Sequence, residues 1–301
     1  MTDTLSDVRL SLGPLQFHWS KADMQRLYRR AADSPVDIVY LGETVCSKRR
    51  EFRHHDWLDT AEFLAAAGKQ VVLSTFALVE AQSELGYIRR ICENGDILVE
   101  ANDMSAVQFL AGRVPFVGGP TLNVFNERAL GKLIDVGLQR WVVPVEMTRD
   151  ILADIRAAAM APIEVEMMTW GRLPLAYSAR CYTARAHDIG KDECGNCCID
   201  YPDGLSMKTR DDDEFLVVNG IQTMSAKTAC LAPAIAEQAD LADILRISPQ
   251  VDGTNTIIRH MDALRRGTID VEDIVEDLGV LAPAGLCDGY VRGTAGMYFD
   301  E

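Results

Sequence analysis

The chain has 301 residues, 48% of them hydrophobic, which is enough for one α/β barrel of roughly 250 residues with a large core. Its 30 lysines and arginines against 45 aspartates and glutamates give a net charge of −15, so we expect no nucleic-acid partner and no long-range attraction to anionic lipid. The N-terminus is acidic where a signal peptide is basic, and no run of about 18 apolar residues occurs, so we expect a cytoplasmic protein without a membrane span.

Short apolar runs alternate with amphipathic segments along most of the chain. The runs predict strands at 9–15, 37–42, 70–75, 96–101, 116–119, 141–147, 163–170, 215–221 and 242–248. The amphipathic segments predict helices at 20–32, 59–68, 78–92, 104–112, 126–138, 149–159, 228–239, 254–266 and 270–278. Ser20 and Asp23 form a capping-box-like start for the first of these helices.

This alternation, with its short connections, predicts a parallel sheet. About eight strands in about 250 residues, with no Gly-x-Gly-x-x-Gly after the first strand, favour a closed barrel over an open dinucleotide-binding sheet. We therefore predict a single TIM-barrel-like parallel (β/α) barrel domain over residues 1–301. A long cysteine-bearing loop at 183–213 is inserted after a late strand, and the glycine-rich end at 281–296 is predicted to be an irregular tail.

The eight cysteines divide into two groups by their sequence context. Cys92 belongs to the apolar stripe of a predicted helix, which is typical of a small core thiol. Cys230 follows Lys227-Thr228-Ala229 at a predicted helix start, where core packing is favoured over a role in a site. Cys287 lies in the glycine-rich tail, and its sequence neighbours suggest no partner.

The remaining cysteines are predicted to meet at one end of the barrel. Cys46 follows the strand at 37–42, and Cys181 follows the strand at 163–170 after a short connection. The carboxyl ends of parallel strands carry the functional site, because the loops that follow them converge there. The inserted loop leaves from the same end and supplies Cys194, Cys197 and Cys198.

Clustered thiols in a reducing compartment more often bind metal or do chemistry than form disulfides. The flanking cations Lys48, Arg49, Arg50 and Arg180 favour thiolates, the form that ligates metal. Four thiolates suit either an iron–sulfur cluster or a structural zinc. The spacing argues mildly against zinc, because one ligand lies more than 100 residues from the others. Reduced free thiols are the third interpretation.

Three segments resemble the collagenase-like U32 peptidase family. EVEMMTWGRLPLAYSARC at 164–181 is similar to a family signature of Glu, Gly and Tyr-Ser-Gly-Arg-Cys, with matches at Glu166, Gly171 and 177–181. GPTLNVFN at 119–126 resembles the family's Pro-Leu-Asn-Val-Tyr-Asn, and SAKTACL at 225–231 its Asn-Ser-Lys-Asp-Leu-Cys. The likeness extends from the first strand to about residue 250.

Two departures from the family pattern resemble its UbiV branch. Pro174 stands where the family often has a cysteine, whereas YLGETVCSKRREF supplies Cys46 instead. The insertion RCYTARAHDIGKDECGNCCIDYPDG at 180–204 is also similar to that branch.

This resemblance implies a heterodimer with a UbiU-like paralogue that supports oxygen-independent hydroxylation of the ubiquinone ring. It implies a lipid-binding accessory protein of the same pathway as a further candidate partner. It also implies a 4Fe-4S cluster in this chain, held by Cys46, Cys181, Cys194 and Cys198. Cys197 is the main alternative to Cys198, and Cys230 is a second-rank alternative.

Polar residues near the predicted mouth are candidates for substrate binding. Arg49 flanks Cys46 and could hold a carboxylate through two hydrogen bonds, or it could neutralise the charge of a cluster. Asn123 lies in the loop after the strand at 116–119, and Glu166 is expected at the end of a later strand. These three residues complete the predicted site, and no catalytic residue is assigned.

Two other functions remain as alternatives to an oxidoreductase-type subunit. A U32-type peptidase or hydrolase is one, although neither a Ser-His-Asp nor a His-Glu-x-x-His constellation is evident, so we do not expect an active protease. A non-catalytic zinc-binding scaffold is the other.

Overall fold

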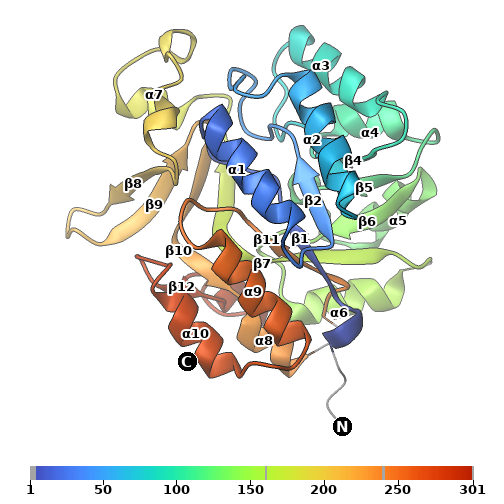
Figure 1. The fold of residues 1–301 in the computed structure, drawn as a ribbon, viewed down its shortest axis with the longest axis vertical. Helices are drawn as coiled ribbons and strands as arrows, with labels where there is room; N and C mark the ends of the chain where they lie inside the picture. The colour runs from blue at the N-terminus through green and yellow to red at the C-terminus, as the bar shows by residue number, and fades with distance from the viewer. Residues whose placement is uncertain (1–4, 160, 239–240, 300–301) are drawn as a thin grey trace.

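The computed structural model describes residues 5–159, 161–238 and 241–299, and within them eight parallel strands close into a barrel (Figure 1). The first seven pair in chain order, and the last strand pairs with both the seventh and the first. The barrel strands are β1 (Arg9–Leu12), β2 (Ile38–Leu41), β3 (Gln70–Ser74), β4 (Leu98–Ala101), β5 (Phe116–Gly118), β6 (Leu138–Val142), β7 (Glu164–Tyr177) and β11 (Ile244–Ile247). The predicted TIM-barrel-like fold is therefore confirmed.

Amphipathic helices surround the barrel (Figure 1). They are α1 (Lys21–Ala32), α2 (His54–Ala66), α3 (Gln82–Cys92), α4 (Met104–Leu110), α5 (Glu127–Asp135), α6 (Arg149–Ala158), α8 (Ala232–Glu237), α9 (Thr254–Arg265) and α10 (Val271–Gly279). Ser20 caps α1 as predicted, since its hydroxyl accepts a hydrogen bond from Asp23 N at 3.2 Å. Helix α2 begins before its predicted start at Asp59, because the Asp56 carboxylate accepts the Arg53 N–H at 2.8 Å and stabilises an earlier first turn.

The strand predicted at 141–147 is displaced towards the N-terminus in the structure. β6 begins at Leu138 and ends at Val142. Pro144 has no N–H group to donate to a neighbouring strand, which explains why the apolar run WVVPV does not continue as strand.

The insertion builds a second, antiparallel sheet onto the barrel. The strand predicted to end at Trp170 runs on as β7 to Tyr177, and beyond Gly171 it leaves the barrel. This extension pairs with β10 (Gln222–Cys230), which pairs with β9 (Glu214–Asn219), which in turn pairs with β8 (Leu205–Lys208). The β8–β9 hairpin projects from the body of the protein in Figure 1.

Two sequence predictions fail around β10. The helix predicted at 228–239 begins only at Ala232, because Ala229 pairs with Gly171 of β7 on one side and Cys287 on the other. The predicted irregular tail contains the short strand β12 (Leu286–Cys287) and the turn of helix α11 (Gly289–Arg292). Small residues such as those in SAKTAC suit either conformation, so the available hydrogen-bonding partners decide between them.

Among the described residues, no helix combines the length and the apolar character needed to cross a membrane.

Gly171→Ala is expected to destabilise the fold by about 1–3 kcal/mol, because a side chain at a strongly positive φ is strained. The backbone there has φ +139°, and an added Cβ would stand 2.5 Å from Cβ of Ser248. Chemical denaturation measures the change. Gly131→Ala in α5 is the matched control: nothing lies within 4 Å of its added Cβ, so the variant should gain about 0.5–1 kcal/mol. Equal denaturation midpoints for Gly171→Ala and wild type would show that a side chain at Gly171, where β7 leaves the barrel, causes no strain.

Candidate functional site at the barrel mouth

Cys46 lies in the loop between β2 and α2, at the carboxyl end of the barrel. The Glu43 carboxylate accepts hydrogen bonds from Val45 N at 2.9 Å and Cys46 N at 3.0 Å, so it folds the loop tightly back on itself. Burial raises the pKa of Glu43, and Arg49 and these two N–H groups oppose that rise. Glu43 therefore fixes the backbone that presents Cys46.

Cys181 follows the extension of β7 and begins the short helix α7 (Tyr182–Ala186). Its sulfur accepts a hydrogen bond from Ala184 N at 3.4 Å, so the side chain caps this helix. Tyr182 N donates to Gly220 O at 2.6 Å, and Gly220 N donates to Thr183 Oγ1 at 2.9 Å. The turn between β9 and β10 thus holds Cys181 at the mouth.

The last three site cysteines lie in the insertion, which docks against the Cys46 loop. Cys194 follows the 3-10 turn Lys191–Glu193, and Cys197 begins the 3-10 turn Cys197–Asp200, which includes Cys198. Lys48 Nζ donates to Lys191 O at 2.6 Å and pairs with Asp192 at 2.7 Å. Lys48 therefore helps to hold the insertion against the Cys46 loop, as does Asn196, whose side-chain amide donates to Lys48 O at 3.4 Å.

Pairwise electrostatic interactions connect the five mouth cysteines into one group. Burial raises the pKa of Cys46, and Cys181 contributes to that rise. Burial likewise raises the pKa of Cys198, which also responds to Cys46 and Cys181. Burial raises the pKa of Cys197, with further contributions from Cys194 and Cys181. The tertiary structure thus assembles thiols that come from three distant parts of the chain.

A structural zinc and a four-iron cluster place different demands on their cysteine ligands. A structural zinc needs four ligands at about 2.0–2.3 Å from one point. In the described part of the chain, no three His, Cys, Asp or Glu side chains converge in that way. A four-iron cluster is held by four cysteine thiolates, each on its own iron, so the sulfurs stand further apart.

The surroundings of Cys197 and Cys198 differ. Cys198 Sγ lies 3.3 Å from His18 Nδ1, and the positive charge of Arg49 opposes the effect of burial on its pKa. Cys197 has Asp200 among the charges that raise its pKa further. Cationic neighbours stabilise a thiolate and anionic ones do not, so these surroundings stabilise a thiolate at Cys198 more than at Cys197.

The other three cysteines are buried. Cys92 is buried on α3, as predicted for a core thiol. Cys230 ends β10 and is buried near Cys287 and Asp288. Cys230 is thus part of the packing between β10, β12 and the barrel.

Arg49 is buried at the centre of the mouth. Its guanidinium donates to Gln16 O and to Asn219 Oδ1, both at 2.7 Å, and lies 3.6 Å from the Glu43 carboxylate. Burial alone would lower the pKa of Arg49, but Glu43 and Cys198 raise it above its ordinary value. Arg49 therefore joins the β1–α1 loop, the Cys46 loop and the end of β9 beside the cysteines.

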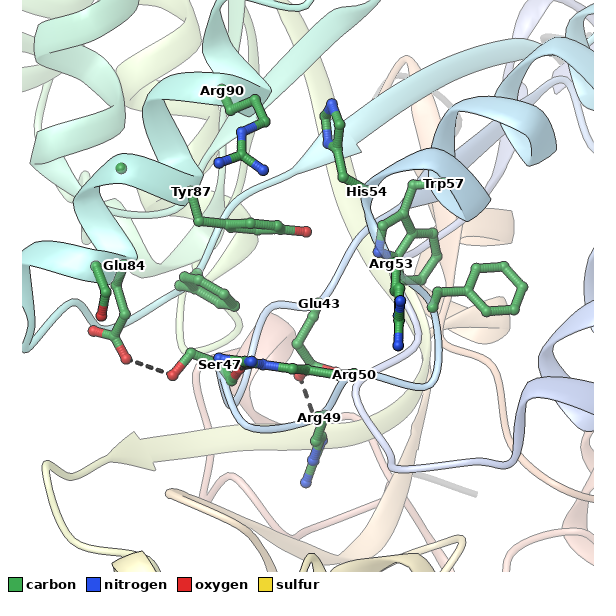
Figure 2. A pocket seen from close by; sticks show the side chains of 14 residues that line it. Glu43, Ser47, Arg49, Arg50, Arg53, His54, Trp57, Glu84, Tyr87 and Arg90 are labelled. Atoms are coloured by element: carbon green, nitrogen blue, oxygen red, sulfur yellow. Dashed lines mark hydrogen bonds and ion pairs between the residues drawn. The ribbon is translucent and has the colours of Figure 1, made fainter.

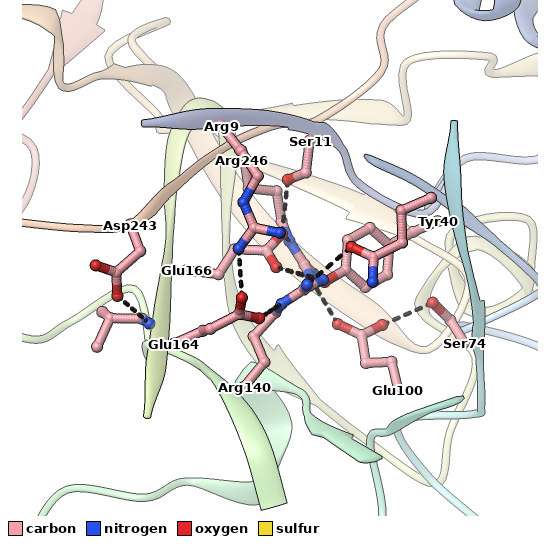
Figure 3. Close-up of polar contacts among 12 residues, drawn as sticks. Arg9, Ser11, Tyr40, Ser74, Glu100, Arg140, Glu164, Glu166, Asp243 and Arg246 are labelled. Carbon is pink, nitrogen blue, oxygen red and sulfur yellow. Dashed lines mark hydrogen bonds and ion pairs between the residues drawn. The ribbon is translucent and has the colours of Figure 1, made fainter. Parts of the chain in front are cut away.

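Glu166 lies inside the barrel instead of at a strand end, so the predicted position was wrong (Figure 3). It is the third residue of β7, and its carboxylate accepts hydrogen bonds from Ser11 Oγ at 2.6 Å, Arg246 Nε at 2.7 Å and Tyr40. Arg246 also pairs with Glu100 at 2.8 Å. The pattern of the strand could not reveal this, because opposite charges from different strands compensate one another only in the closed barrel.

Asn123 lies on the loop after β5, as predicted. It ends the 3-10 turn Pro120–Leu122 in the left-handed conformation at φ 54°, which asparagine tolerates better than most residues. Its side chain is exposed.

A cationic cleft of about 580 Å³ lies beside the Cys46 loop (Figure 2). Helices α2 and α3 form its walls, and the cationic groups that line it are Arg49, Arg50, Arg53 and Arg90, with the His54 imidazole beside them. Its aromatic lining consists of Phe52, Trp57, Phe76 and Tyr87. In a chain of net charge −15, such a concentration of cations suits an anionic ligand with a flat apolar body.

Sequence reasoning missed four contributors to this mouth. His18 and Gln16 lie in the β1–α1 loop, Asn219 ends β9, and Arg90 lies on α3. Each is an isolated polar residue in its own segment, and only its position at the carboxyl end of the barrel could have marked it as a candidate.

Comparison with known proteins gives one family match and several remote structural neighbours. The model of peptidase family U32 matches residues 22–284. The U32 peptidase Mk0906 is 12% identical with a TM-score of 0.46, over 81% of this chain and 94% of that chain. A tryptophan synthase from Mycobacterium tuberculosis is 12% identical with a TM-score of 0.41, over 87% and 89%. Dihydropteroate synthase (FolP) from Thermus thermophilus is 13% identical with a TM-score of 0.39, over 86% and 93%.

Thiol alkylation at pH 8 is expected to separate the two groups of cysteines. Burial raises the pKa values of Cys92, Cys230 and Cys287 to about 12, 11 and 12, so about 0.1% or less of each is thiolate at pH 8. Their labelling should increase only as the pH approaches these values, while the partly exposed mouth cysteines react first. Mass spectrometry of iodoacetamide-treated, metal-free protein measures the rates, with denatured protein as the control. Labelling of Cys230 as fast as Cys181 would contradict the assignment.

Proposed function

Because this chain belongs to peptidase family U32, we propose that it is the iron–sulfur subunit of an oxygen-independent system that hydroxylates the ubiquinone ring. In this proposal it is a cytoplasmic protein of the UbiV branch, acting with a UbiU-like paralogue and with a lipid-binding accessory protein. The observation that supports the proposal is that Cys46, Cys181 and Cys198 interact electrostatically at the barrel mouth, where Lys48 interacts with both Cys46 and Cys194. These are the four cysteines that the resemblance to that branch implies as ligands.

The residues around the thiols suit them to hold a 4Fe-4S cluster. Such a cluster supplies one-electron transfer when it is bound. Four thiolate ligands give it a negative charge, and Arg49 and Lys48 lie close enough to compensate part of that charge. Cys46 and Cys198 are partly buried, which limits the access of water to the site. The chain is thus suited to an electron-relay role, and ring chemistry in the heterodimer can involve the partner.

The cationic cleft provides a place for an anionic co-substrate next to this centre. Glu43, Ser47 and Arg49 line the cleft and also belong to the loop that presents Cys46. Arg53, immediately before α2, and Arg90 of α3 line the cleft (Figure 2). Charge-assisted hydrogen bonds from these guanidinium groups would hold a carboxylate, while the aromatic walls would pack against its body.

One arrangement favours a second candidate function, a thiol hydrolase. His18 lies between Cys198 at 3.3 Å and the Glu51 carboxylate at 3.4 Å, which is the order of nucleophile, base and orienting acid. Burial, however, raises the pKa of Cys198, and burial together with Arg49 lowers the pKa of His18. Both groups are then neutral near pH 7, whereas an activated thiol nucleophile is a thiolate. Peptide hydrolysis by the metal-free chain that is lost in Cys198→Ala would support this second candidate.

Anaerobically purified chain is expected to contain iron and acid-labile sulfide in equal amounts, near four of each per chain. Cys181→Ala should lose most of both, because one of four thiolate ligands is removed. Iron and sulfide assays, with the visible absorption spectrum, measure this. Zinc without sulfide in the wild-type chain would overturn the proposal in favour of the zinc-binding scaffold.

Two comparisons sharpen that experiment. Cys92→Ala changes a buried cysteine on α3 and should retain full iron content. Cys198→Ala should lose iron, whereas Cys197→Ala should retain it, because the cationic Arg49 stabilises the thiolate of Cys198. The reverse result for this pair would assign the ligand to Cys197.

The double variant Arg53→Gln and Arg90→Gln is expected to raise the KM for the co-substrate by about 10–100-fold, since a charge-assisted hydrogen bond contributes about 1.5–3 kcal/mol. Its iron content should equal that of wild type, because the proposed ligands are the thiols and neither arginine is among them. Steady-state hydroxylation by the reconstituted heterodimer measures KM. Arg128→Gln is the control, since this α5 side chain is 92% exposed. An unchanged KM in the double variant would show that the co-substrate does not bind in this cleft.

A further inference from the structure

A second cleft opens at the carboxyl end of the barrel, between α1 and α9, and we call it the α1–α9 cleft. Its volume is about 570 Å³, which is within the range of pockets for small ligands. Its walls are the loops after β1 and β11, the side of α1, the first turn of α9 and the inserted segment at 199–202. Among the described residues, it shares no lining residue with the cationic cleft. The barrel mouth therefore offers two separate places for ligands.

Hydrogen bonds hold the walls of the α1–α9 cleft in place. The indole N–H of Trp19 donates to Pro202 O at 2.6 Å and so joins the loop after β1 to the inserted segment. Val251 N donates to Asp203 Oδ1 at 3.0 Å, which joins the loop after β11 to the same segment. The cleft is thus formed before a ligand enters, and binding does not have to order its walls.

Apolar side chains form much of the lining. Trp19 and Leu27 are buried there, whereas Ile199 and Val251 are 37% and 44% exposed. Large apolar side chains that stay exposed around a cleft are typical of a binding surface, because a ligand with an apolar body removes them from water.

The polar part of the lining carries little uncompensated charge. Arg26 pairs with Asp23, and Arg30, the remaining cation of the lining, is exposed to water. In the described part of the chain, the side-chain amide of Asn255 makes no hydrogen bond, so it is available to a hydroxyl or carbonyl group of a ligand. This lining suits a neutral ring with an oxygen substituent, whereas the cationic cleft suits an anion.

We propose that the α1–α9 cleft binds the ring substrate, an uncharged aromatic ring with an oxygen substituent and a prenyl tail. This inference rests on the proposed function, in which a ring and an anionic co-substrate meet at one centre. Ile199 lines the cleft and directly follows Cys198, and His18, another lining residue, lies 3.3 Å from Cys198 Sγ. A ring held here is beside the cysteine site, and its tail packs along Ile199 and Val251.

The experiment measures the Kd of ortho-prenylphenol, a phenol with one isoprene unit, by isothermal titration calorimetry on the full-length, metal-free chain. Val251→Asp places a charge where the tail packs, and the fold tolerates it because this side chain is 44% exposed. Val280→Asp is the matched control, since the same substitution is made at a side chain that is 81% exposed and lines neither cleft. The double variant Arg53→Gln and Arg90→Gln tests the cationic cleft in the same assay.

Val251→Asp is expected to weaken the binding of ortho-prenylphenol about tenfold, because the apolar contact with the tail is lost. Val280→Asp and the double arginine variant should bind it as wild type does. An unchanged Kd in Val251→Asp, weaker binding in the double arginine variant, or no binding to the wild-type chain would each overturn the inference. Benzoate that binds as tightly as ortho-prenylphenol, and is weakened equally in Val251→Asp, would assign the cleft to anions and overturn it as well.

The iron and sulfide content of anaerobically purified chain tests the proposed function separately. Wild-type chain that contains iron and sulfide but binds no ortho-prenylphenol overturns only the inference. Wild-type chain without iron and sulfide that binds ortho-prenylphenol, with the expected weakening in Val251→Asp, overturns the proposed function and supports the ring site.

Kinetics of the reconstituted heterodimer distinguish ring binding from partner binding. Val251→Asp should raise the KM for the ring substrate about tenfold and leave the KM for the anionic co-substrate unchanged. Weaker association of the two subunits, with an unchanged KM for the ring, would assign Val251 to the subunit interface and overturn the inference.

Discussion

The buried guanidinium of Arg49 holds the barrel mouth together. It joins Gln16 O, Asn219 Oδ1 and the Glu43 carboxylate, and so connects the loops after β1 and β2 with the inserted sheet. A buried charge left without its partner costs about 3–5 kcal/mol, so these segments are coupled through one side chain. Since Cys46 lies three residues before Arg49 and Cys198 faces it, the arrangement of the thiols depends on the same contact.

The barrel interior and the mouth use buried charge differently. Inside, Glu166, Glu100, Arg246 and Arg140 compensate one another across strands, and serine and tyrosine hydroxyls complete their hydrogen bonding (Figure 3). This network makes a rigid polar layer under the site. At the mouth, cationic groups outnumber the anionic ones that line the cleft (Figure 2). An acidic protein that gathers cations at one place is suited to bind anionic groups there.

Much of the fold could be predicted from the spacing of apolar residues. The barrel strands and most of the helices follow the predicted alternation, because a βα unit buries its apolar face in a way that leaves a local pattern. The exceptions have physical causes. The run around Ala229 looks helical but is strand, since β7 and β12 offer partners on both sides. The pattern predicts Glu166 at a strand end, but its neighbours along the chain could not reveal the charges that surround it.

The sequence by itself determined the barrel class, the division of the cysteines into core and mouth, and the family resemblance. These follow from local periodicity and from motifs that are contiguous in the chain. Only the tertiary structure decided that His18 and Arg49 meet Cys198, and that Lys48 binds the insertion to the Cys46 loop. The physical reason is that hydrogen bonds and charges act through space over a few ångströms, whereas these partners are up to 180 residues apart in the chain.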